Sequence, residues 1–559
     1  MNAPDRGKGT IDPVSLGILW DRLISITNEI VQTLVRTSFS SVARENYDLS
    51  CVLFDARGRS LAQGAMSVPV FVGTAPLTMR HMLDRFPPDT LQSGDVVVTN
   101  DIGMGTGHLW DVNIMRPAFR NGRVVGYAMS ISHLPDIGGR GFSAINANMF
   151  EEGLQIPILK IVRAGVLNDD LIEVIRANVR VSDQVIGDLM ANISATDVGC
   201  RQLVEFMDEY GLEDLDTLSD MIIGQSASAM RRAIASIPDG TYTNSILVEA
   251  FDDPVRLACS VTVAGDRLSI DFEGTSDVVP AAINVPACYT LAVATYAIKS
   301  LVLPGVPNNE GSVTPIEVSA PAGCILDARA PAATGARLLV GHFIVPLLYG
   351  ALAAALPYRV QGDPGMMNIL NFVGRDRRGR DFAALYFSAG GFGALHGLDG
   401  TSATPAPSNM MVMPTETWET MTSLQVVSRT LLPDSGGPGE FRGGLGQRIV
   451  LTNCDSNPVT VFVMGCRTEY PAQGVCGGGH GALRRFLLNG AEIHAKGRYE
   501  MRAGDVLEVI EAGGGGYGAP SRRDRRAIEE DIRQRFVTPE GALRDYGYLP
   551  RVAPEATAP

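Results

Sequence analysis

The chain has 559 residues, of which 45% are hydrophobic and 19% charged, and a formal net charge of −14. These values indicate a globular protein with a sizeable core, arranged as about two to four domains or as one large fold. The acidic balance argues against a nucleic-acid binder, and the lack of an apolar run of ~18 residues argues against a membrane-spanning protein.

The N-terminal segment predicts a tail followed by a long helix. Residues 1–11 are expected to be disordered, and because they lack the apolar stretch of a signal peptide we expect a cytoplasmic protein. Asp12 is a favourable N-cap and Pro13 suits the first helical position, so a helix is predicted from there to about Ser38. Its apolar residues recur with the 3.6-residue period of a helix on a core. They are Leu16, Leu19, Leu23, Ile26, Ile30 and Leu34.

The next segment predicts strands that end near two histidines. Strands are expected over 51–55, 96–98, 111–117 and 124–131, with a helix over 74–86. Asn121-Gly122 favours a two-residue hairpin turn between the last two strands. His108 and His133 are therefore expected in loops or at strand ends, where a rigid scaffold holds chemical groups.

The remainder of the chain is predicted to contain both helical and β-rich stretches. Helices are predicted within 170–236, over 287–301, over 336–356 with a kink or break at Pro346, and as an exposed helix over 522–536. Strands are predicted over 242–252 and 257–272, within 365–395 and within 424–517, with a loop over 401–420. The arginine-rich segments 375–378 and 522–526 each contain an acid and are interpreted as solvated surface.

This order of elements predicts an α+β fold without internal repeats. It would comprise an N-terminal α/β metal-binding region, a helical middle and a β-rich C-terminal region. The expected boundaries are an N-terminal α/β metal-site domain at 12–240, a central α+β domain at 241–420, a β-rich region at 421–520 and a helical tail at 521–559.

Two histidines share a local pattern. His108 is followed by Asp111 and His133 by Asp136, each pair beside glycines, in a chain with seven histidines. Imidazole and carboxylate bind borderline divalent metals such as Zn, Mn or Fe. If the hairpin pairs the two strands, His108, Asp111 and His133 converge and leave a coordination position open for water or substrate. From the residues alone, this metal site and a hydrogen-bonded turn remain alternatives.

Other candidate motifs are weaker. Asp136 and Asp101 are each interpreted either as a cap of a turn or as a group that orients a ligand or transfers a proton. The glycine-rich stretch 103–107 lacks the Lys-Ser/Thr of a phosphate loop, and Gly513–Gly516 lacks dinucleotide-binding spacing. No Gly-x-Ser-x-Gly elbow occurs, and the eight cysteines form no Cys-x-x-Cys pair. His342 and His396 are expected to serve packing or local hydrogen bonding.

A series of motifs, taken in order, resembles the hydantoinase B/oxoprolinase family, which includes the α subunits of acetone carboxylase-type enzymes. The resemblance covers about residues 12–550. The stretches that carry it include Asp48-Leu-Ser-Cys51, Asn100-Asp101, His108-Leu-Trp-Asp111, Ser132-His133-Leu-Pro-Asp136, Phe150-Glu-Glu-Gly153, Asp271-Phe-Glu-Gly274, Pro433-Asp434, Arg442-Gly-Gly-Leu-Gly446 and Gly513-Gly-Gly-Gly-Tyr517.

The resemblance implies that this chain carries out one part of a reaction that two subunits share. A partner of hydantoinase A type would bind ATP and Mg and phosphorylate the carbonyl oxygen of a cyclic amide, and this chain would carry a divalent metal and open the ring with water. Its metal ligands would be His108, Asp111 and His133, with Asp48 as a fourth, and Asp136 would accept a proton. Without the resemblance, Asp48 is a polar residue that starts a strand.

Two other functions remain open. In the related carboxylases the same arrangement carboxylates a ketone, and a structural subunit would use its His/Asp cluster only to stabilise a loop. The length favours the hydantoinase type. This chain departs from the family at Trp110, where many relatives have proline, at 408–416, and at 331–338, which lacks the usual Gly-Asn. These departures indicate a changed substrate pocket.

Overall fold

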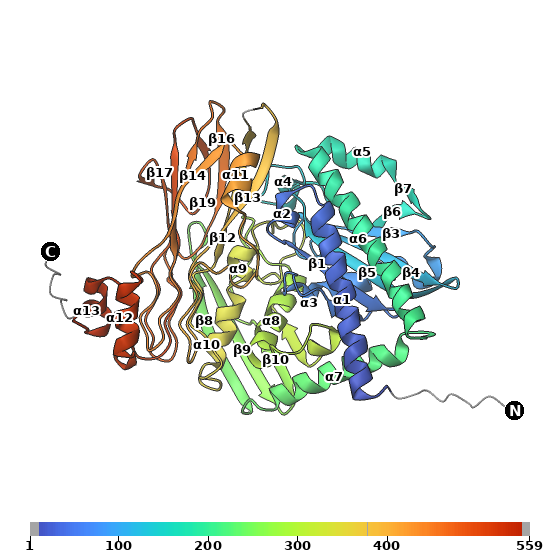
Figure 1. The fold of residues 1–559 in the computed structure, drawn as a ribbon, viewed down its shortest axis with the longest axis horizontal. Coiled ribbons are helices and arrows are strands. Elements are labelled where there is room, and N and C mark those ends of the chain that lie inside the picture. The colour runs from blue at the N-terminus through green and yellow to red at the C-terminus, as the bar shows by residue number, and fades with distance from the viewer. Residues whose placement is uncertain (1–10, 377, 550–559) are drawn as a thin grey trace, which may run out of the picture.

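Four β-sheets organise the part of the chain that this computed structural model describes, residues 11–376 and 378–549 (Figure 1). Helices pack on the sheets, so the expected α+β class is confirmed. All of the predicted tail except Ile11 lies outside the described residues, as does the end of the chain beyond 549. The predicted domain boundaries stay a prediction.

The first sheet has seven strands in the order β2-β1-β5-β4-β3-β6-β7. Its central strands are buried on both faces, and alternate residues of a strand point to opposite faces. On β1, Cys51 and Leu53 join the core beneath the helices α1 (Pro13–Thr37) and α6 (Ser182–Glu209), whereas Val52 and Phe54 join the core on the other face. The strands are β1 (Leu49–Asp55), β2 (Ser60–Gln63), β3 (Val96–Thr99), β4 (Asp111–Arg120), β5 (Arg123–His133), β6 (Leu159–Arg163) and β7 (Val166–Leu167).

The helices around this sheet begin and end close to the predicted positions. In α1 (Pro13–Thr37) the Asp12 carboxylate accepts hydrogen bonds from the amides of Val14 and Ser15, as an N-cap should. Figure 1 shows α1 beside α6 (Ser182–Glu209) across the sheet. The others are α2 (Ser41–Arg44), α3 (Phe71–Arg85), α4 (Met149–Glu152), α5 (Asp169–Asn178) and α7 (Asp216–Ile234), with short 3₁₀ turns at Pro88–Thr90, Glu310–Ser312 and Pro520–Arg522.

A second sheet, in the order β11-β10-β9-β8, carries the central helices. The helix predicted over 336–356 is broken as expected: α9 (Leu338–Gly341) ends before α10 (Ile344–Leu352) begins. Pro346 lies in the first turn of α10, where its missing N–H removes no helical hydrogen bond. The strands are β8 (Gly240–Val248), β9 (Val255–Ala264), β10 (Arg267–Asp271) and β11 (Ile316–Ser319), and α8 (Ala287–Val302) packs on α10 and α3.

Two further sheets share one core and form a β-sandwich. Their orders are β13-β12-β16-β19 and β14-β15-β20-β17-β18. The strands are β12 (Met367–Arg375), β13 (Asp381–Ala389), β14 (Leu424–Leu431), β15 (Gln447–Asn453), β16 (Val459–Met464), β17 (Arg485–Leu488), β18 (Ala491–Glu492), β19 (Lys496–Met501) and β20 (Val506–Ile510). The prediction of a loop over 401–420 is wrong at its C-terminal end, where the chain forms the helix α11 (Thr415–Met421). This helix inserts Trp418 into the core against Phe372 and Tyr386.

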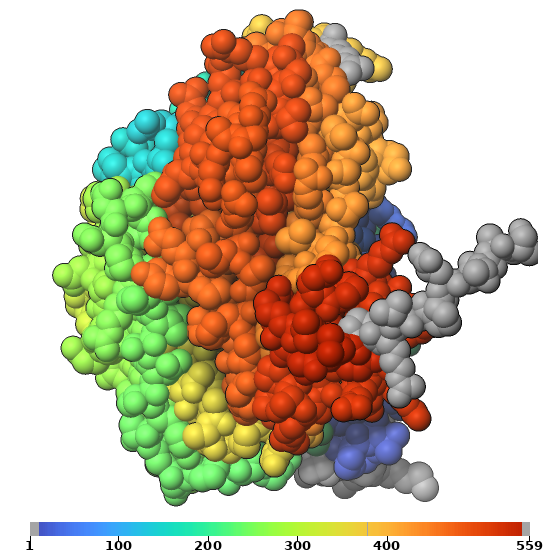
Figure 2. Space-filling model, turned by 90° about the vertical axis from the view of Figure 1, so that its left-hand side faces the viewer, coloured from blue at the N-terminus to red at the C-terminus, as the bar shows by residue number. Residues whose placement is uncertain are grey.

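The C-terminal helices α12 (Arg525–Arg533) and α13 (Pro539–Tyr546) pack against the C-terminal β region, as Figure 2 shows in red. The exposed helix predicted over 522–536 is shorter than expected, and it packs Ile528 and Asp531 on the protein while most of its other residues are exposed. Arg523 is buried because its guanidinium pairs with Asp399 and Asp531, both at 2.7 Å. In the other arginine-rich segment, Arg375 ends β12 and forms an exposed pair with Asp381, as expected for a surface position. None of the helices described here combines the length and apolarity of a membrane span.

Glycine-rich segments pack backbone to backbone next to the sandwich. Gly514, within the segment Gly513–Gly516, forms two backbone hydrogen bonds with the stretch 437–444. Its N–H donates to Gly444 O at 2.9 Å, and its carbonyl oxygen accepts from Gly437 N–H at 2.7 Å. A Cβ on Gly514 would lie 2.2 Å from the carbonyl oxygen of Phe392. These glycines therefore serve close backbone packing, which a side chain would prevent.

Replacing Gly514 by alanine should therefore destabilise the protein. The new Cβ meets backbone rather than a movable side chain, and overpacking of this kind costs about 1–3 kcal/mol or more. Differential scanning calorimetry should show a lower Tm for Gly514→Ala. The control is Gly224→Ala inside α7, where no atom lies within 4 Å of the new Cβ and alanine favours the helix; an unchanged Tm in Gly514→Ala would contradict the packing argument.

Candidate metal centre

The pairing of three neighbouring strands brings the predicted site residues together. Asp111 begins β4 and lies directly opposite His133, which ends β5. On the other side of β5, Leu49 pairs with Ser132, and His133 N–H donates to Asp48 O at 3.0 Å. The antiparallel register therefore places Asp48, Asp111 and His133 at one end of the sheet.

His108 joins this end from the loop that follows β3. Its Nε2 lies 2.9 Å from Asp111 Oδ2, and its ring centroid lies 5.2 Å from that of His133. One potential ligand atom from each of His108, Asp111 and His133 lies within 4.8 Å of the others, and all three side chains are buried. Two imidazoles and a carboxylate this close together could hold a divalent metal ion.

The hydrogen bonding of the two imidazoles fits a metal. His133 Nδ1 lies 2.8 Å from Leu134 O. A carbonyl oxygen only accepts, so Nδ1 carries the proton and Nε2 keeps its lone pair. That Nε2 is buried without a hydrogen-bond partner, as is His108 Nδ1. Burial lowers the pKa of His133 to about 3, which keeps the imidazole in the neutral form that binds metals.

Asp111 is held as an anion. Burial raises the pKa of a carboxyl group, but His108 and Arg337 outweigh burial and keep the pKa of Asp111 below its usual range. Its Oδ2 accepts hydrogen bonds from Thr106 Oγ1 at 2.8 Å and from Arg337 Nη2 at 3.0 Å. The carboxylate is thereby fixed in position beside the two imidazoles.

Asp48 lines the same cavity but lies outside the group of three. Burial and the nearby charge of Asp111 raise the pKa of Asp48 well above its ordinary value. Its role as a fourth ligand stays a prediction. The cavity measures about 40 Å³, which is room for an ion and a few small groups. Most of its other walls are apolar, from Val68, Val70, Phe71, Phe142, Leu338, Met367, Ile369, Phe387 and Met410.

Asp136 and Asp101 both make the contacts of turn caps. Asp136 accepts from the amide of Gly138 at 3.1 Å and from the guanidinium of Arg180 at 2.5 Å. Asp101 accepts from the amides of Gly103 and Met104 at 2.9 and 3.0 Å. Neither lines the cavity around His108. These contacts favour the capping interpretation, and a proton-accepting role for Asp136 stays a prediction that they do not support.

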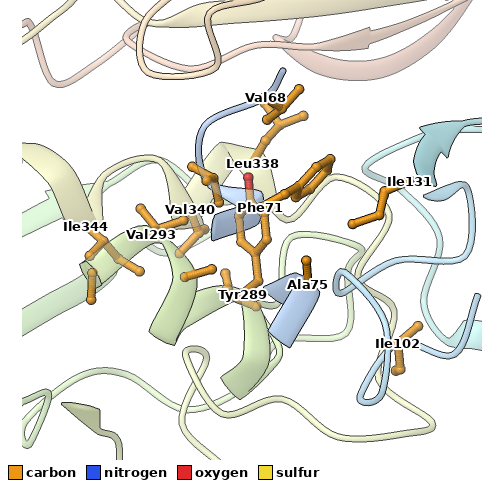
Figure 3. Close-up of a cluster of buried hydrophobic side chains, with 14 of the residues drawn as sticks. Val68, Phe71, Ala75, Ile102, Ile131, Tyr289, Val293, Leu338, Val340 and Ile344 are labelled. Atoms are coloured by element: carbon orange, nitrogen blue, oxygen red, sulfur yellow. The ribbon is translucent and has the colours of Figure 1, made fainter. Parts of the chain in front are cut away.

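Three further cavity residues, Arg337, Tyr289 and His342, come from distant parts of the chain, and the sequence reasoning assigned none of them to the site. Arg337 contacts Asp111, its Cζ lies 4.1 Å from the centroid of the Tyr289 ring, and Tyr289 OH lies 3.2 Å from His342 Nε2. Figure 3 shows Tyr289 and Leu338 next to Val68 and Phe71 in the buried cluster. Only the family departure over 331–338 hinted at Arg337, because nothing local in the sequence indicates which side chain will reach a site 226 residues away.

A buried glutamate supports the segment that carries Arg337. Glu152 Oε1 accepts from the amides of Thr334 and Gly335 at 2.9 and 2.5 Å. Burial nevertheless raises the pKa of Glu152 to about 8, from 4.5. This shift favours the protonated, uncharged carboxyl group in the folded protein.

Comparisons with known proteins agree with these features. The chain matches the hydantoinase B/oxoprolinase family model over residues 12–520. It is 28% identical to one subunit of a putative D-/L-hydantoinase of Pseudomonas sp. (strain NS671), over 96% of this chain and 95% of that one. The crystal structure of the ATP-dependent caprolactamase from Pseudomonas jessenii superposes with a TM-score of 0.91 at 26% identity, covering 98% of both chains. A nucleotide-free acetone carboxylase superposes with a TM-score of 0.86 at 21% identity, over 97% of this chain and 80% of that one, and shares the fold.

Loss of either central imidazole should remove bound metal. In His108→Ala or His133→Ala the cavity loses one of its candidate nitrogen ligands, so elemental analysis of the purified variants should show metal well below one equivalent per chain. His480→Ala, at an exposed histidine outside the cavity, should retain the wild-type content. Equal metal content in all four proteins would contradict the assignment.

The buried Glu152 should make stability depend on pH. Its pKa is raised in the folded state, so the folded protein binds more protons between about pH 4.5 and 8, and the free energy of unfolding falls as pH rises through that window. Glu152→Gln keeps the acceptor oxygen without an ionisable group. The Tm difference between the variant and the wild type should therefore shift in favour of the variant from pH 5 to pH 8.5, and a constant difference would contradict the raised pKa.

Proposed function

Since this chain belongs to the hydantoinase B/oxoprolinase family, we propose that it is the metal-binding catalytic subunit of an ATP-dependent, heteromeric amidohydrolase that opens a cyclic amide. A hydantoinase A-type partner binds ATP and Mg and phosphorylates the carbonyl oxygen of the amide. The observation that carries the proposal is the buried group of His108, Asp111 and His133, with unpartnered imidazole nitrogens in a small, mostly apolar cavity.

Two findings support a division of the reaction between chains. The hydantoinase relative is named as a subunit, and the caprolactamase neighbour is named as ATP-dependent. This sequence has no Gly-x-x-x-x-Gly-Lys phosphate loop, which is consistent with ATP binding on the partner. The chain would then receive a substrate that has already been activated.

Activation is needed because a lactam carbonyl is a poor electrophile. Phosphorylation of its oxygen creates an imidate-like centre to which water adds. The ring C–N bond then breaks as the nitrogen takes up a proton, and hydrolysis of the resulting acyl phosphate gives the carboxylate and inorganic phosphate. His108, Asp111 and His133, with Asp48 as the predicted fourth ligand, would hold the divalent ion. When bound, the ion would act as a Lewis acid and lower the pKa of a water ligand to near neutral. Zn, Mn and Fe each suit this set of ligands.

The residues of the chain itself hold and isolate the reacting groups. The Leu134 carbonyl fixes the tautomer and orientation of His133, and Thr106 and Arg337 fix the carboxylate of Asp111. The apolar walls exclude bulk water, which strengthens electrostatic interactions inside the cavity. Fixed ligands and the exclusion of bulk water both help the site to stabilise the transition state of hydrolysis.

The decisive experiment uses the chain co-purified with its A-type partner. ATP-dependent turnover should appear with at least one member of a panel of lactams and hydantoins, without any need for bicarbonate. His108→Ala/His133→Ala should abolish ring opening, because the metal site is lost, whereas His480→Ala should not change it.

Three outcomes would contradict the proposal. Product formation only from a ketone plus bicarbonate would make the complex a carboxylase. Full activity of the metal-free double variant would remove the metal from the mechanism. Activity of the partner alone would make this chain a structural subunit.

A further inference from the structure

Arg337 brings a permanent positive charge into the metal cavity. It is 5% exposed and is the N-cap residue of α9, and among the described residues that line the cavity it is the one arginine or lysine. Its Nη2 donates to Asp111 Oδ2 at 3.0 Å, and the guanidinium lies over the Tyr289 ring. The side chain therefore has a fixed position within reach of the reacting groups.

Most donors of this guanidinium have no acceptor within the described part of the chain. Arginine carries five N–H donors in a planar fork, and the bond to Asp111 uses one of them. The Nε atom is buried without a hydrogen-bond partner. Leaving a charged donor unpaired in a dry cavity is costly, and the fork matches the geometry of a carboxylate or phosphate. The unused donors thus indicate a missing oxyanion.

Two features support the position of Arg337: a glycine that lies against its side chain and a buried glutamate that holds the backbone just before it. A Cβ on Gly107, where φ is +97°, would lie 3.1 Å from Cδ and Nε of Arg337, so glycine is needed there. On the far side, Glu152 holds the amides of Thr334 and Gly335. The glycine-rich stretch 103–107, which is no phosphate loop, therefore makes room for Arg337.

We propose that Arg337 is the oxyanion-binding residue of this cavity. It takes either a carboxylate substituent of the cyclic amide or the phosphoryl group added to its carbonyl oxygen. The inference rests on the proposed function. With an ion bound, the ion and Arg337 together exceed the negative charge of Asp48 and Asp111, so the cavity attracts an anion.

The direct test measures phosphate binding. Isothermal titration calorimetry with inorganic phosphate is carried out on the metal-loaded complex of wild type, Arg337→Gln, Arg337→Lys and Arg329→Gln. Arg329 is an exposed arginine eight residues upstream that pairs with Asp327, and its variant is the matched control. We expect Arg337→Gln to weaken phosphate binding roughly ten- to a hundred-fold, the size of a lost charge-assisted contact, with Arg337→Lys in between and the control unchanged.

Kinetics then identify the source of the oxyanion. 5-Oxoproline and 2-pyrrolidone share a ring and differ by one carboxylate. If Arg337 binds that carboxylate, Arg337→Gln raises KM for 5-oxoproline and leaves 2-pyrrolidone unaffected. If it binds the phosphoryl group, Arg337→Gln lowers kcat for both by a similar factor.

Clear results would overturn the inference. Equal phosphate affinity in wild type and Arg337→Gln, or no phosphate binding by the wild type, excludes an oxyanion site. If Arg337→Gln loses metal and regains wild-type phosphate affinity when metal is restored, Arg337 only positions Asp111. Where Arg337→Gln fails to fold, as judged by its Tm, Arg337→Lys decides. A complex that hydrolyses no lactam while Arg337→Gln still weakens phosphate binding refutes the proposed function and leaves the oxyanion site standing.

Discussion

The pairing of His133 with Asp111 across β4 and β5 is the constraint on which the rest of the site depends. Because side chains alternate along a strand, a shift of one residue would turn one partner out of the cavity. The two-residue turn at Asn121-Gly122 pairs Arg120 with Arg123, and a bulge between Ala118 and Phe119 then shifts the register by one residue, which brings Asp111 opposite His133. The cores on both faces of the sheet hold this register. The stability of the N-terminal sheet and the geometry of the site therefore have one physical origin.

Around this pair, charged and polar side chains are buried away from bulk water. Two imidazoles with free lone pairs, an ionised carboxylate and a guanidinium lie in a cavity whose other walls are mostly apolar. Such a group is expensive to bury unless an ion and a ligand complete it. The proposed metal ion and, at Arg337, the proposed anion would satisfy these unpartnered groups.

The sequence predicted the local parts of this arrangement well. The Asp12 cap, the break near Pro346 and the hairpin before His133 depend on neighbouring residues, and all three are confirmed. The prediction failed where distant contacts decide. Trp418 turned an expected loop into a buried helix, and the pairing of Arg523 with Asp399 buried an arginine expected on the surface.

The sequence by itself determined the family, the α+β class and the two histidines with Asp111, since these follow from motifs and from periodic patterns within short stretches. Only the tertiary structure decided that Asp136 faces Arg180 instead of the cavity, and that Arg337 enters the site beside Gly107. The reason is physical: strand pairing and capping act over a few residues, whereas the approach of Arg337 to Asp111 depends on how two separately formed sheets and their helices pack.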